Sequence, residues 1–296
     1  MIAHAADSLM DAVDRLAAPV CVGIDPVVAR LPEGLRQADD TTISVAEAIG
    51  SFTLHLLDAV AGRVPCVKLQ SACFERYGHA GVKVLGECIA AARQRGLVVI
   101  LDAKRGDIGI SAEHYAAAVF GDGAGRGDDA RPDWLTINSY LGEDGIRPFL
   151  GAGRGAFALV RTSNPGGDAV QGQRLADGRT VAESIAAVVA SIGEDFVGPG
   201  GYSSLGAVVA ATRPEDAASL RRLMPRQIFL VPGFGAQGGG VADVLPCFSA
   251  EGRGAIITAS RSVIYAFEDG KGGWAAGVAE AAERFADEIG RAAGLR

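Results

Sequence analysis

Short apolar runs alternate with amphipathic stretches along the whole chain, and this repeat limits the fold more than any other feature. The runs are apolar on both faces, which is typical of strands buried in a parallel sheet that helices cover. The stretches between them, such as 45–60 and 82–95, have the spacing of amphipathic helices. Eight apolar runs can be counted, at 20–24, 64–69, 97–102, 133–138, 156–161, 205–211, 227–232 and 254–259.

Eight strand and helix units in one chain favour a closed barrel over an open doubly wound sheet. No G-x-G-x-x-G follows the first run, where a dinucleotide-binding sheet would need it. Before that run, Leu9, Met10, Val13 and Leu16 recur at helical spacing. We therefore expect an α/β fold, a single (β/α)8 TIM barrel over 1–296 with an N-terminal helix and extended loops.

The charge of the chain argues against several classes of function. Lys and Arg total 28 against 35 Asp and Glu, and the net charge is −7 without a long basic run. Such a chain lacks the electrostatic footprint of a nucleic-acid-binding protein. An export signal would begin with positive charge and continue with an unbroken apolar stretch, but this N-terminal segment contains Asp7, Asp11 and Asp14. The sequence therefore predicts no export signal. No run of about 18 uncharged apolar residues predicts a membrane span.

The cysteines have neither CxxC spacing nor the Cys/His spacing of a metal site. Several lie in apolar segments, and their number is odd. We expect them to be reduced core residues of a cytoplasmic protein. They are Cys21, Cys66, Cys73, Cys88 and Cys247.

A cluster of charges follows the third apolar run. The sequence VILDAKRGDIGIS at 99–111 contains Asp102, Lys104 and Asp107. Side chains two residues apart on a strand point the same way, so we expect Asp102 and Lys104 on one face and Asp107 in the turn beyond. Charges so close to an apolar strand perturb one another's pKa and mark a candidate functional site. The same spacing also fits a structural ion pair that caps a strand, and spacing alone does not separate the two.

Polar residues also stand at the ends of other predicted strands. In a barrel the carboxyl ends of all strands meet at one mouth, where ionisable groups are typical of catalysis. Taken singly, each has a structural explanation, such as a turn cap, a snorkelling amine or a helix cap. Together they predict one shared site. Besides the pair at 102 and 104, they are Asp25, Lys68, Ser163, Gln237 and Arg261.

Two segments near the end of the chain predict a phosphate pocket. The glycine-rich PGFGAQGGG at 232–240 follows the seventh run, and ASRS at 259–262 follows the eighth. In such barrels the loops after strands seven and eight commonly bind phosphate, because free backbone N–H groups and a helix N-terminus favour an anion. Arg261 adds a guanidinium suited to phosphate oxygens. A glycine-rich turn alone would be weak evidence, but here both expected positions agree.

Two polar segments, 121–132 and 164–180, predict long loops rather than domain linkers. The second follows the fifth strand at the face where barrel active sites lie. It fits a lid over the site, and it fits a disordered insertion equally well.

The stretch DAKRGDIGIS at 102–111 resembles the signature of the orotidine 5′-phosphate decarboxylase family. That signature has an Asp, a Lys two positions on, and a second Asp three further on, followed by Ile, Gly or Pro, and a hydroxyl residue. Further matches occur in the family's order and cover nearly the whole barrel. They are GIDP at 23–26, VKLQ at 67–70, RTSNPGG at 161–167, PGFGAQGG at 232–239 and ASRS at 259–262. The long loops resemble the subgroup found in many actinobacteria and some other bacteria.

The resemblance implies the decarboxylation of orotidine 5′-phosphate to uridine 5′-monophosphate, the last step of de novo UMP biosynthesis. It implies an alternating array of Lys68, Asp102, Lys104 and Asp107, in which Lys104 gives a proton to C6 of the pyrimidine. Asp107 would come from the neighbouring subunit of an obligatory homodimer. Ser111 stands where the family usually has a Thr that reaches the partner subunit's ribose, and it keeps the hydroxyl.

The resemblance also implies how the substrate is held. Asp25 and Lys68 would contact ribose hydroxyls, Ser163 the pyrimidine, and Gln237 with Arg261 the phosphate. No metal and no organic cofactor is implied, because fixed charges would stabilise the carbanion that other decarboxylases delocalise into a cofactor.

Two other interpretations remain open at this point. One is a metal-dependent sugar-phosphate decarboxylase or aldolase on the same barrel, whose acid on the second strand holds Mg²⁺; here Lys68 stands at that position. The other is a non-catalytic sensor that binds a nucleotide phosphate. Degenerate enzymes usually lose charged catalytic groups first, and none is missing here.

Overall fold

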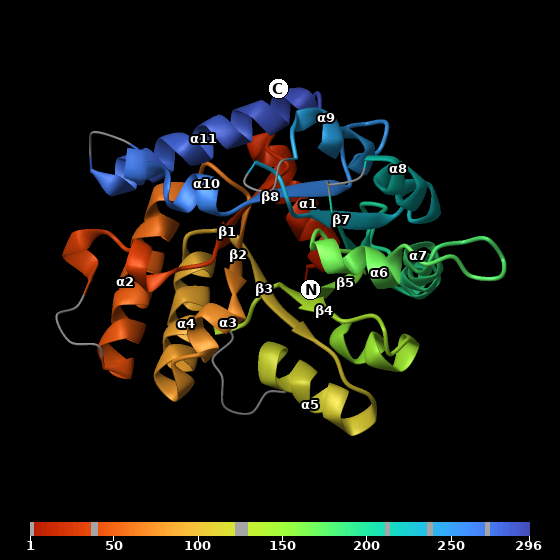
Figure 1. The fold of residues 1–296 in the computed structure, drawn as a ribbon, viewed down its shortest axis with the longest axis horizontal. Helices are drawn as coiled ribbons and strands as arrows, with labels where there is room; N and C mark the ends of the chain where they lie inside the picture. The colour runs from red at the N-terminus through yellow and green to blue at the C-terminus, as the bar shows by residue number, and fades with distance from the viewer. Residues whose placement is uncertain (1–2, 37–40, 122–129, 211–213, 236–238, 270–272) are drawn as a thin grey trace.

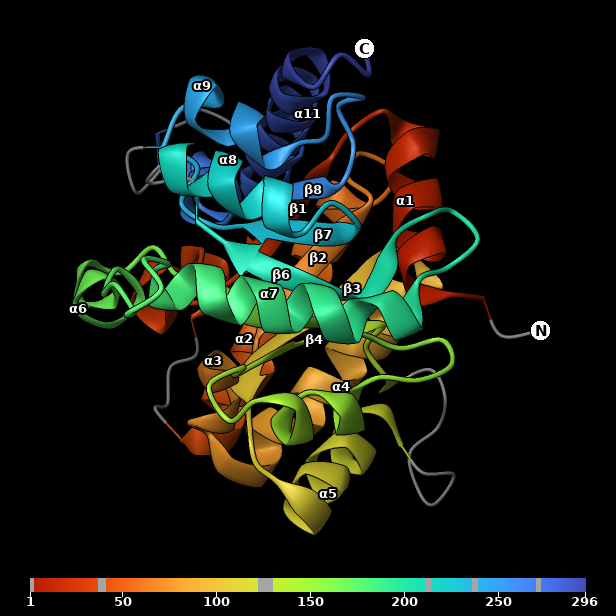
Figure 2. The ribbon, with the colours of Figure 1, turned by 90° about the vertical axis from the view of Figure 1, so that its right-hand side faces the viewer.

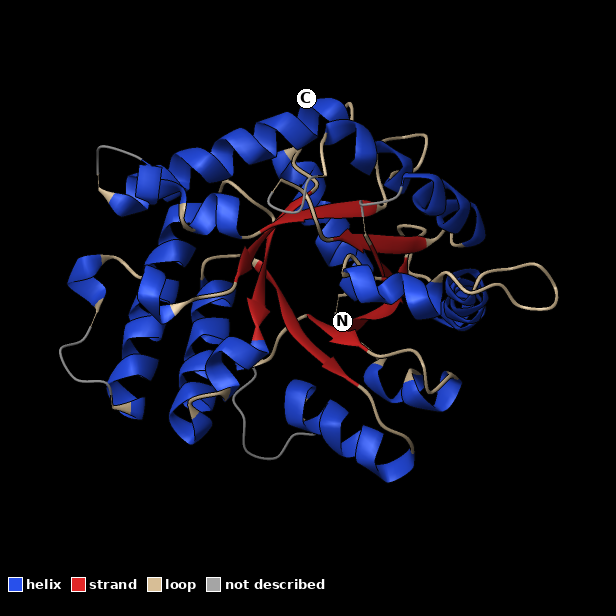
Figure 3. Cartoon of the chain, viewed as in Figure 1, coloured by secondary structure: helices blue, strands red, loops and turns tan. Residues whose placement is uncertain are grey.

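The computed structural model describes residues 3–36, 41–121, 130–210, 214–235, 239–269 and 273–296. Within them, parallel strands pair in chain order, and the last pairs with the first to close a barrel that helices surround (Figures 1 and 3). The expected TIM barrel is confirmed, with all eight apolar runs forming strands. The strands are β1 (Val20–Ile24), β2 (Cys66–Gln70), β3 (Val98–Arg105), β4 (Trp134–Ile137), β5 (Gly155–Arg161), β6 (Ser203–Val209), β7 (Gln227–Val231) and β8 (Ala255–Ala259).

The helices form the outer layer, and short ones also occupy the loops at the strand ends. Their buried apolar side chains and the outward-facing strand residues make up the larger hydrophobic core. The α-helices are α1 (Ala5–Leu16), α2 (Thr42–Val60), α3 (Ser71–Glu75), α4 (Gly78–Gln94), α5 (Gly109–Phe120), α6 (Asp168–Gln171), α7 (Val181–Gly193), α8 (Pro214–Leu223), α9 (Val241–Val244), α10 (Arg261–Ile264) and α11 (Trp274–Ala292).

The expected N-terminal helix is confirmed as α1, and it closes one end of the barrel. Its residues Leu9, Met10 and Val13 are buried in a second core with side chains of the barrel interior, including Trp134 and Phe157. In Figure 2, α1 lies at the opposite end of the molecule from α6, which follows β5. The mouth at the carboxyl ends of the strands is therefore the end available for a ligand.

Helix α2 is long and apolar enough to span a membrane by length and composition, the one such helix found in the described residues. Its 18-residue apolar window is 56% buried inside the protein. It packs against α4 and α11, as expected of a helix that covers a barrel. All five cysteines lie in described parts of the chain and are free thiols.

The two predicted long loops have different outcomes. Most of 121–132 lies outside the described residues. The segment 164–180 is described throughout and is ordered rather than a disordered insertion, because it contains α6 and a bridge between Arg174 and Thr180.

Candidate active site

A cavity of about 460 Å³ opens at the carboxyl ends of the strands. It brings together six of the residues predicted from the sequence: Asp25, Lys68, Asp102, Lys104, Ser163 and Arg261. Asp107 and Ser111 do not line the cavity of their own chain, and Gln237 lies outside the described residues. The other lining residues are Gln70, Thr136, Leu159, Thr162, Asn164, Val208, Leu230, Pro232, Gly233, Phe234, Thr258 and Ser260.

Asp102 lies between two ammonium groups. Lys68 Nζ donates to Asp102 Oδ2 at 2.7 Å, and Lys104 Nζ donates to Asp102 Oδ1 at 2.5 Å. Lys68 and Asp102 are 7% and 6% exposed, whereas the Lys104 side chain is 47% exposed. Lys68 is thus nearly buried in the wall of the cavity, whereas Lys104 extends its charge into it.

The close charges shift the pKa values of the buried pair. Burial alone would raise the pKa of Asp102, but Lys68 and Lys104 outweigh it and hold that pKa well below its ordinary value. Burial alone would lower the pKa of Lys68, but Asp102 and then Asp25 raise it above its ordinary value. Both groups are therefore ionised at neutral pH.

Two polar residues that the sequence analysis did not single out hold Asp102 in place. Gln70 Nε2 donates to Asp102 Oδ2 at 3.2 Å, and Thr136 Oγ1 donates to Asp102 Oδ1 at 2.8 Å. Gln70 ends β2 and is paired in register with Asp102. Thr136 is a lone polar residue within the apolar β4, and this interruption is the sequence signal that could have identified it.

Asp25 follows β1 and has a free acceptor. Its Oδ1 lies 3.7 Å from Lys68 Nζ and has no hydrogen-bond partner in the described part of the chain. The Tyr265 hydroxyl accepts from the Val27 N–H at 2.7 Å, and Arg30 stacks on the Tyr265 ring at 3.8 Å. The loop that carries Asp25 is thereby fixed to the segment after β8.

The segments after β7 and β8 form another part of the cavity wall. Pro232, Gly233 and Phe234 come from the first, and Ser260 and Arg261 from the second. Arg261 is the first residue of α10, and among the described residues no carboxylate forms an ion pair with it. Its guanidinium is available to an anion.

The Thr258 hydroxyl on β8 is a further functional candidate that the sequence analysis missed. Its residue lines the cavity and is 5% exposed, and its Oγ1 has no partner within the described residues. Such a hydroxyl can donate to a ligand or accept from one.

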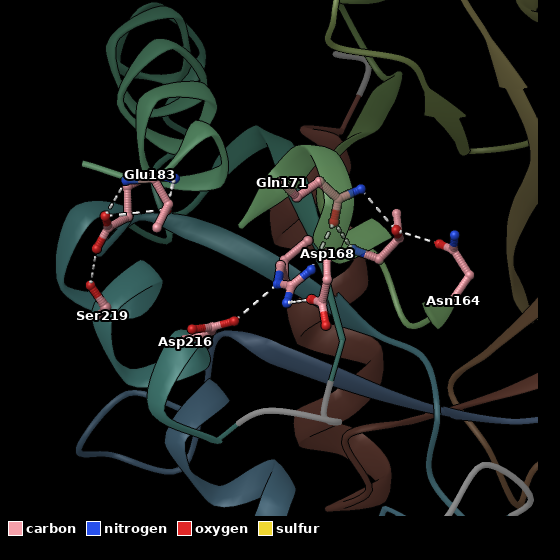
Figure 4. Close-up of polar contacts among 9 residues, drawn as sticks. Asn164, Asp168, Gln171, Glu183, Asp216 and Ser219 are labelled. Atoms are coloured by element: carbon pink, nitrogen blue, oxygen red, sulfur yellow. Dashed lines mark hydrogen bonds and ion pairs between the residues drawn. The ribbon is translucent and has the colours of Figure 1, made fainter. Parts of the chain in front are cut away.

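The loop after β5 is held by a second network of charges, shown in Figure 4. Arg161 at the end of β5 is 5% exposed and forms ion pairs with Asp168 of α6 and Asp216 of α8. Gln171 accepts from the Thr162 N–H at 2.9 Å and donates to the Thr162 hydroxyl at 2.8 Å. Ser163, which follows in the chain, is therefore presented to the cavity from an anchored loop.

Comparison with known proteins decides the family. The family model described as "Orotidine 5'-phosphate decarboxylase / HUMPS family" matches residues 18–271. The chain belongs to this family. A relative named orotidine 5′-phosphate decarboxylase from Rhodopirellula baltica is 43% identical over 267 residues, 88% of each chain. One of the same name from Deinococcus radiodurans is 42% identical over 281 residues, 93% of each chain.

Solved structures agree with this membership. The structure titled OMP decarboxylase from Leishmania donovani superposes with a TM-score of 0.78 at 28% identity, covering 99% of each chain. The family resemblance inferred from the motifs is confirmed, as is the barrel. The actinobacterial subgroup remains a prediction. Of the residues carried over from the family's motifs, Lys68 of β2 and Lys104 of β3 both contact Asp102 directly.

Proposed function

We propose that this chain decarboxylates orotidine 5′-phosphate to uridine 5′-monophosphate, the last step of de novo UMP biosynthesis, without a cofactor. The observation that carries the proposal is the half-exposed Lys104 side chain, whose ammonium pairs with Asp102 in a cavity that also contains Arg261, an arginine with no ion pair to any described residue. The family relatives bear the name of this activity.

The Lys104 ammonium meets the demand of the reaction. When the bond between C6 and the carboxylate breaks, the electron pair stays on C6 and CO2 leaves. The nearby cation stabilises that pair, and its N–H then supplies the proton that forms the C6–H bond. The amine regains a proton from solvent. Leu159, Val208 and Leu230 line the same cavity and keep its dielectric low, which strengthens the electrostatic effect.

The carboxylates keep the lysine charged and can also stress the substrate. A substrate carboxylate about 4 Å from an aspartate is repelled by roughly 4 kcal/mol at an effective dielectric near 20. If the repulsion is fully relieved in the transition state, it is worth about three decades in rate. In this proposal the array consists of Lys68, Asp102, Lys104 and Asp107.

The other groups hold the nucleotide. Asp25 Oδ1, which accepts no hydrogen bond from the described residues, accepts from a ribose hydroxyl, and the nearby Lys68 ammonium also contacts the ribose hydroxyls. Ser163 binds the pyrimidine from its anchored loop, and Arg261 with Gln237 binds the phosphate. Binding energy at the phosphate, far from C6, then helps to assemble the site.

We further propose that the active form is a homodimer in which Asp107 and Ser111 complete the partner's site. Asp107 lies in the turn after β3 and Ser111 in the first turn of α5, and neither lines the cavity of its own chain. Large apolar side chains are exposed around them, as expected of a surface that a second copy covers. These are Ile108, Ile110, Tyr115, Tyr140 and Leu141.

Mixing two inactive variants tests the shared site. In a hybrid of Lys104→Ala and Asp107→Ala subunits, one site carries both changes and the other carries neither. Equal random mixing should therefore restore about a quarter of wild-type activity, because half of the dimers are hybrids with one intact site. No recovery, in hybrids shown to form by differential tagging, would place Asp107 in its own subunit's site.

A direct assay tests the proposed activity. Orotidine 5′-phosphate absorbs in the ultraviolet, and its loss is followed with purified protein, with and without EDTA. We expect turnover that EDTA does not change. Bound but unconsumed nucleotide would indicate the non-catalytic sensor. Activity abolished by EDTA would indicate the metal-dependent enzyme. The Lys68 ammonium argues against a metal site, because it repels a divalent cation.

We also infer a cytoplasmic location. The five free thiols, of which four are buried, support it because reducing compartments preserve them. Fractionation of cells that express a tagged chain tests this inference.

A further inference from the structure

We propose that Thr136 is a positioning residue for Lys104, whose hydroxyl sets the backbone that aims the lysine at C6. The inference rests on the proposed function and adds to it a residue on β4 that does not itself react. It starts from an irregularity in the pairing of β3 with β4.

The irregularity is a bulge at the end of β3. Leu101 pairs with Leu135, but the next pair joins Arg105 to Ile137. Three residues of β3, at 102–104, thus lie opposite one residue of β4, which is Thr136. A bulge takes backbone groups out of the ladder, so they need other partners.

Lys104 has the unusual backbone in this bulge. Its φ is +46°, a left-handed conformation that residues with a Cβ rarely adopt. The Thr136 hydroxyl accepts from the Lys104 N–H at 3.0 Å and so supplies the acceptor that the ladder lacks. Strained backbone of this kind persists where its surroundings hold it, and it is typical of functional sites.

The same hydroxyl also fixes the carboxylate that Lys104 touches. Because the Lys104 N–H is a donor, the only proton of the Thr136 hydroxyl is left for Asp102 Oδ1, at 2.8 Å. That oxygen in turn accepts from Lys104 Nζ at 2.5 Å. The three hydrogen bonds close a ring that holds both ends of Lys104, its backbone and its ammonium.

Water has little access to the position of this hydroxyl, because Thr136 is 1% exposed. Water therefore cannot readily replace the hydrogen bonds that the hydroxyl makes. Removing the hydroxyl leaves a backbone N–H and a carboxylate oxygen without this partner. The lysine is then free to leave its productive direction. A displacement of about 1 Å at a reacting group costs on the order of 100-fold in rate.

The test compares Thr136→Val with Thr136→Ser. Valine keeps the shape and removes the hydroxyl, and we expect kcat to fall about 100-fold while KM changes less than about threefold. Serine keeps the hydroxyl and should restore kcat to within about fivefold of wild type. Thr53→Val is the matched control, because it removes a buried hydroxyl from α2 that does not line the cavity, and it should leave kcat unchanged.

A second readout isolates the proton transfer. Exchange of the C6 hydrogen of uridine 5′-monophosphate in D2O, followed by NMR, should slow in Thr136→Val in parallel with kcat. Should valine prevent folding, Thr136→Ala is measured with the same expectations.

The inference is overturned if the folded variant without the hydroxyl keeps kcat within twofold of wild type, or if serine fails to restore it. It is also overturned if the affinity for uridine 5′-monophosphate falls as far as kcat, since the hydroxyl would then serve binding. Absence of turnover in the wild type would instead overturn the proposed function, and this inference with it.

Discussion

Two buried charge networks lie at the same end of the barrel, and they differ in the sign of the central charge and in whether a charged group remains accessible to a ligand. At the ends of β2 and β3, one carboxylate, Asp102, lies between Lys68 and Lys104. At the end of β5, one guanidinium, Arg161, lies between Asp168 and Asp216. Both central groups are nearly inaccessible to solvent.

The difference lies in the outer partners. Lys104 is half exposed and lines the cavity, so its ammonium can act on a ligand as well as on Asp102. Arg161 instead uses Nε, Nη1 and Nη2 on Asp216, Gln171 and Asp168. Burial alone would lower the pKa of Arg161, but its hydrogen bonds to the two aspartates raise it. A buried ion pair thus serves chemistry where one partner faces a ligand, and it fixes a loop where each guanidinium nitrogen already donates to a loop or helix side chain.

Replacing the exposed lysine should have the largest effect. We expect Lys104→Ala to lower kcat at least about 10⁴-fold, because it removes both the proton donor and the stabilising charge. Binding of uridine 5′-monophosphate should stay measurable by calorimetry. Lys83→Ala is the control, since Lys83 is an exposed lysine of α4 that pairs with Glu87. Near-normal kcat in Lys104→Ala would reject the role of this lysine.

Removing the central guanidinium of the β5 network should lower stability more than chemistry. We expect Arg161→Met to lower the free energy of unfolding by about 2 kcal/mol, because hydrogen bonds between charged groups are lost in a buried position. Urea unfolding measures the change, and kcat of the folded fraction should stay within about threefold of wild type. Arg147→Met, which breaks only exposed ion pairs, is the control and should change stability much less. A large loss of kcat at unchanged KM would show that the β5 network takes part in catalysis and does not only fix the loop.

A milder change to the β5 network should appear in binding. Gln171→Leu removes the amide that holds Thr162 and leaves the Arg161 ion pairs intact. We expect KM for orotidine 5′-phosphate to rise about fivefold, with kcat within about twofold, because Ser163 is held less firmly. Steady-state kinetics measures both constants. An unchanged KM would mean that the loop needs no such support.

The pH dependence of stability should show the smallest effect. The pKa of Asp102 is lower in the folded chain than in the unfolded one, so its contribution is present above about pH 4 and is lost as the pH falls towards the folded value. The raised pKa of Lys68 gives a contribution that is present below about pH 10 and is lost as the pH rises further. Between pH 7 and pH 3, Asp102→Asn should therefore lose about 1 kcal/mol less than wild type. Equal losses in urea unfolding would contradict the low pKa.

Local patterns were enough to predict the barrel and much of the site. Strands buried on both faces leave continuous apolar runs, and the closed barrel brings their carboxyl ends to one mouth. Residues at those ends, such as Asp25, Lys68 and Arg261, therefore meet in one cavity. The prediction that Asp102 and Lys104 lie together is confirmed by their contact, although the left-handed Lys104 departs from the simple alternation on which it was based.

The sequence by itself determined the order of strands and helices, the position of the mouth and the types of charge around it, because these follow from periodicity within single segments. Only the tertiary structure decided which partners those charges have. The bulge that places Thr136 opposite residues 102–104 depends on the register between β3 and β4. The ion pair of Arg161 with Asp216 joins residues that are 55 positions apart in the sequence. Such contacts depend on how separate segments pack in space, which no local pattern encodes.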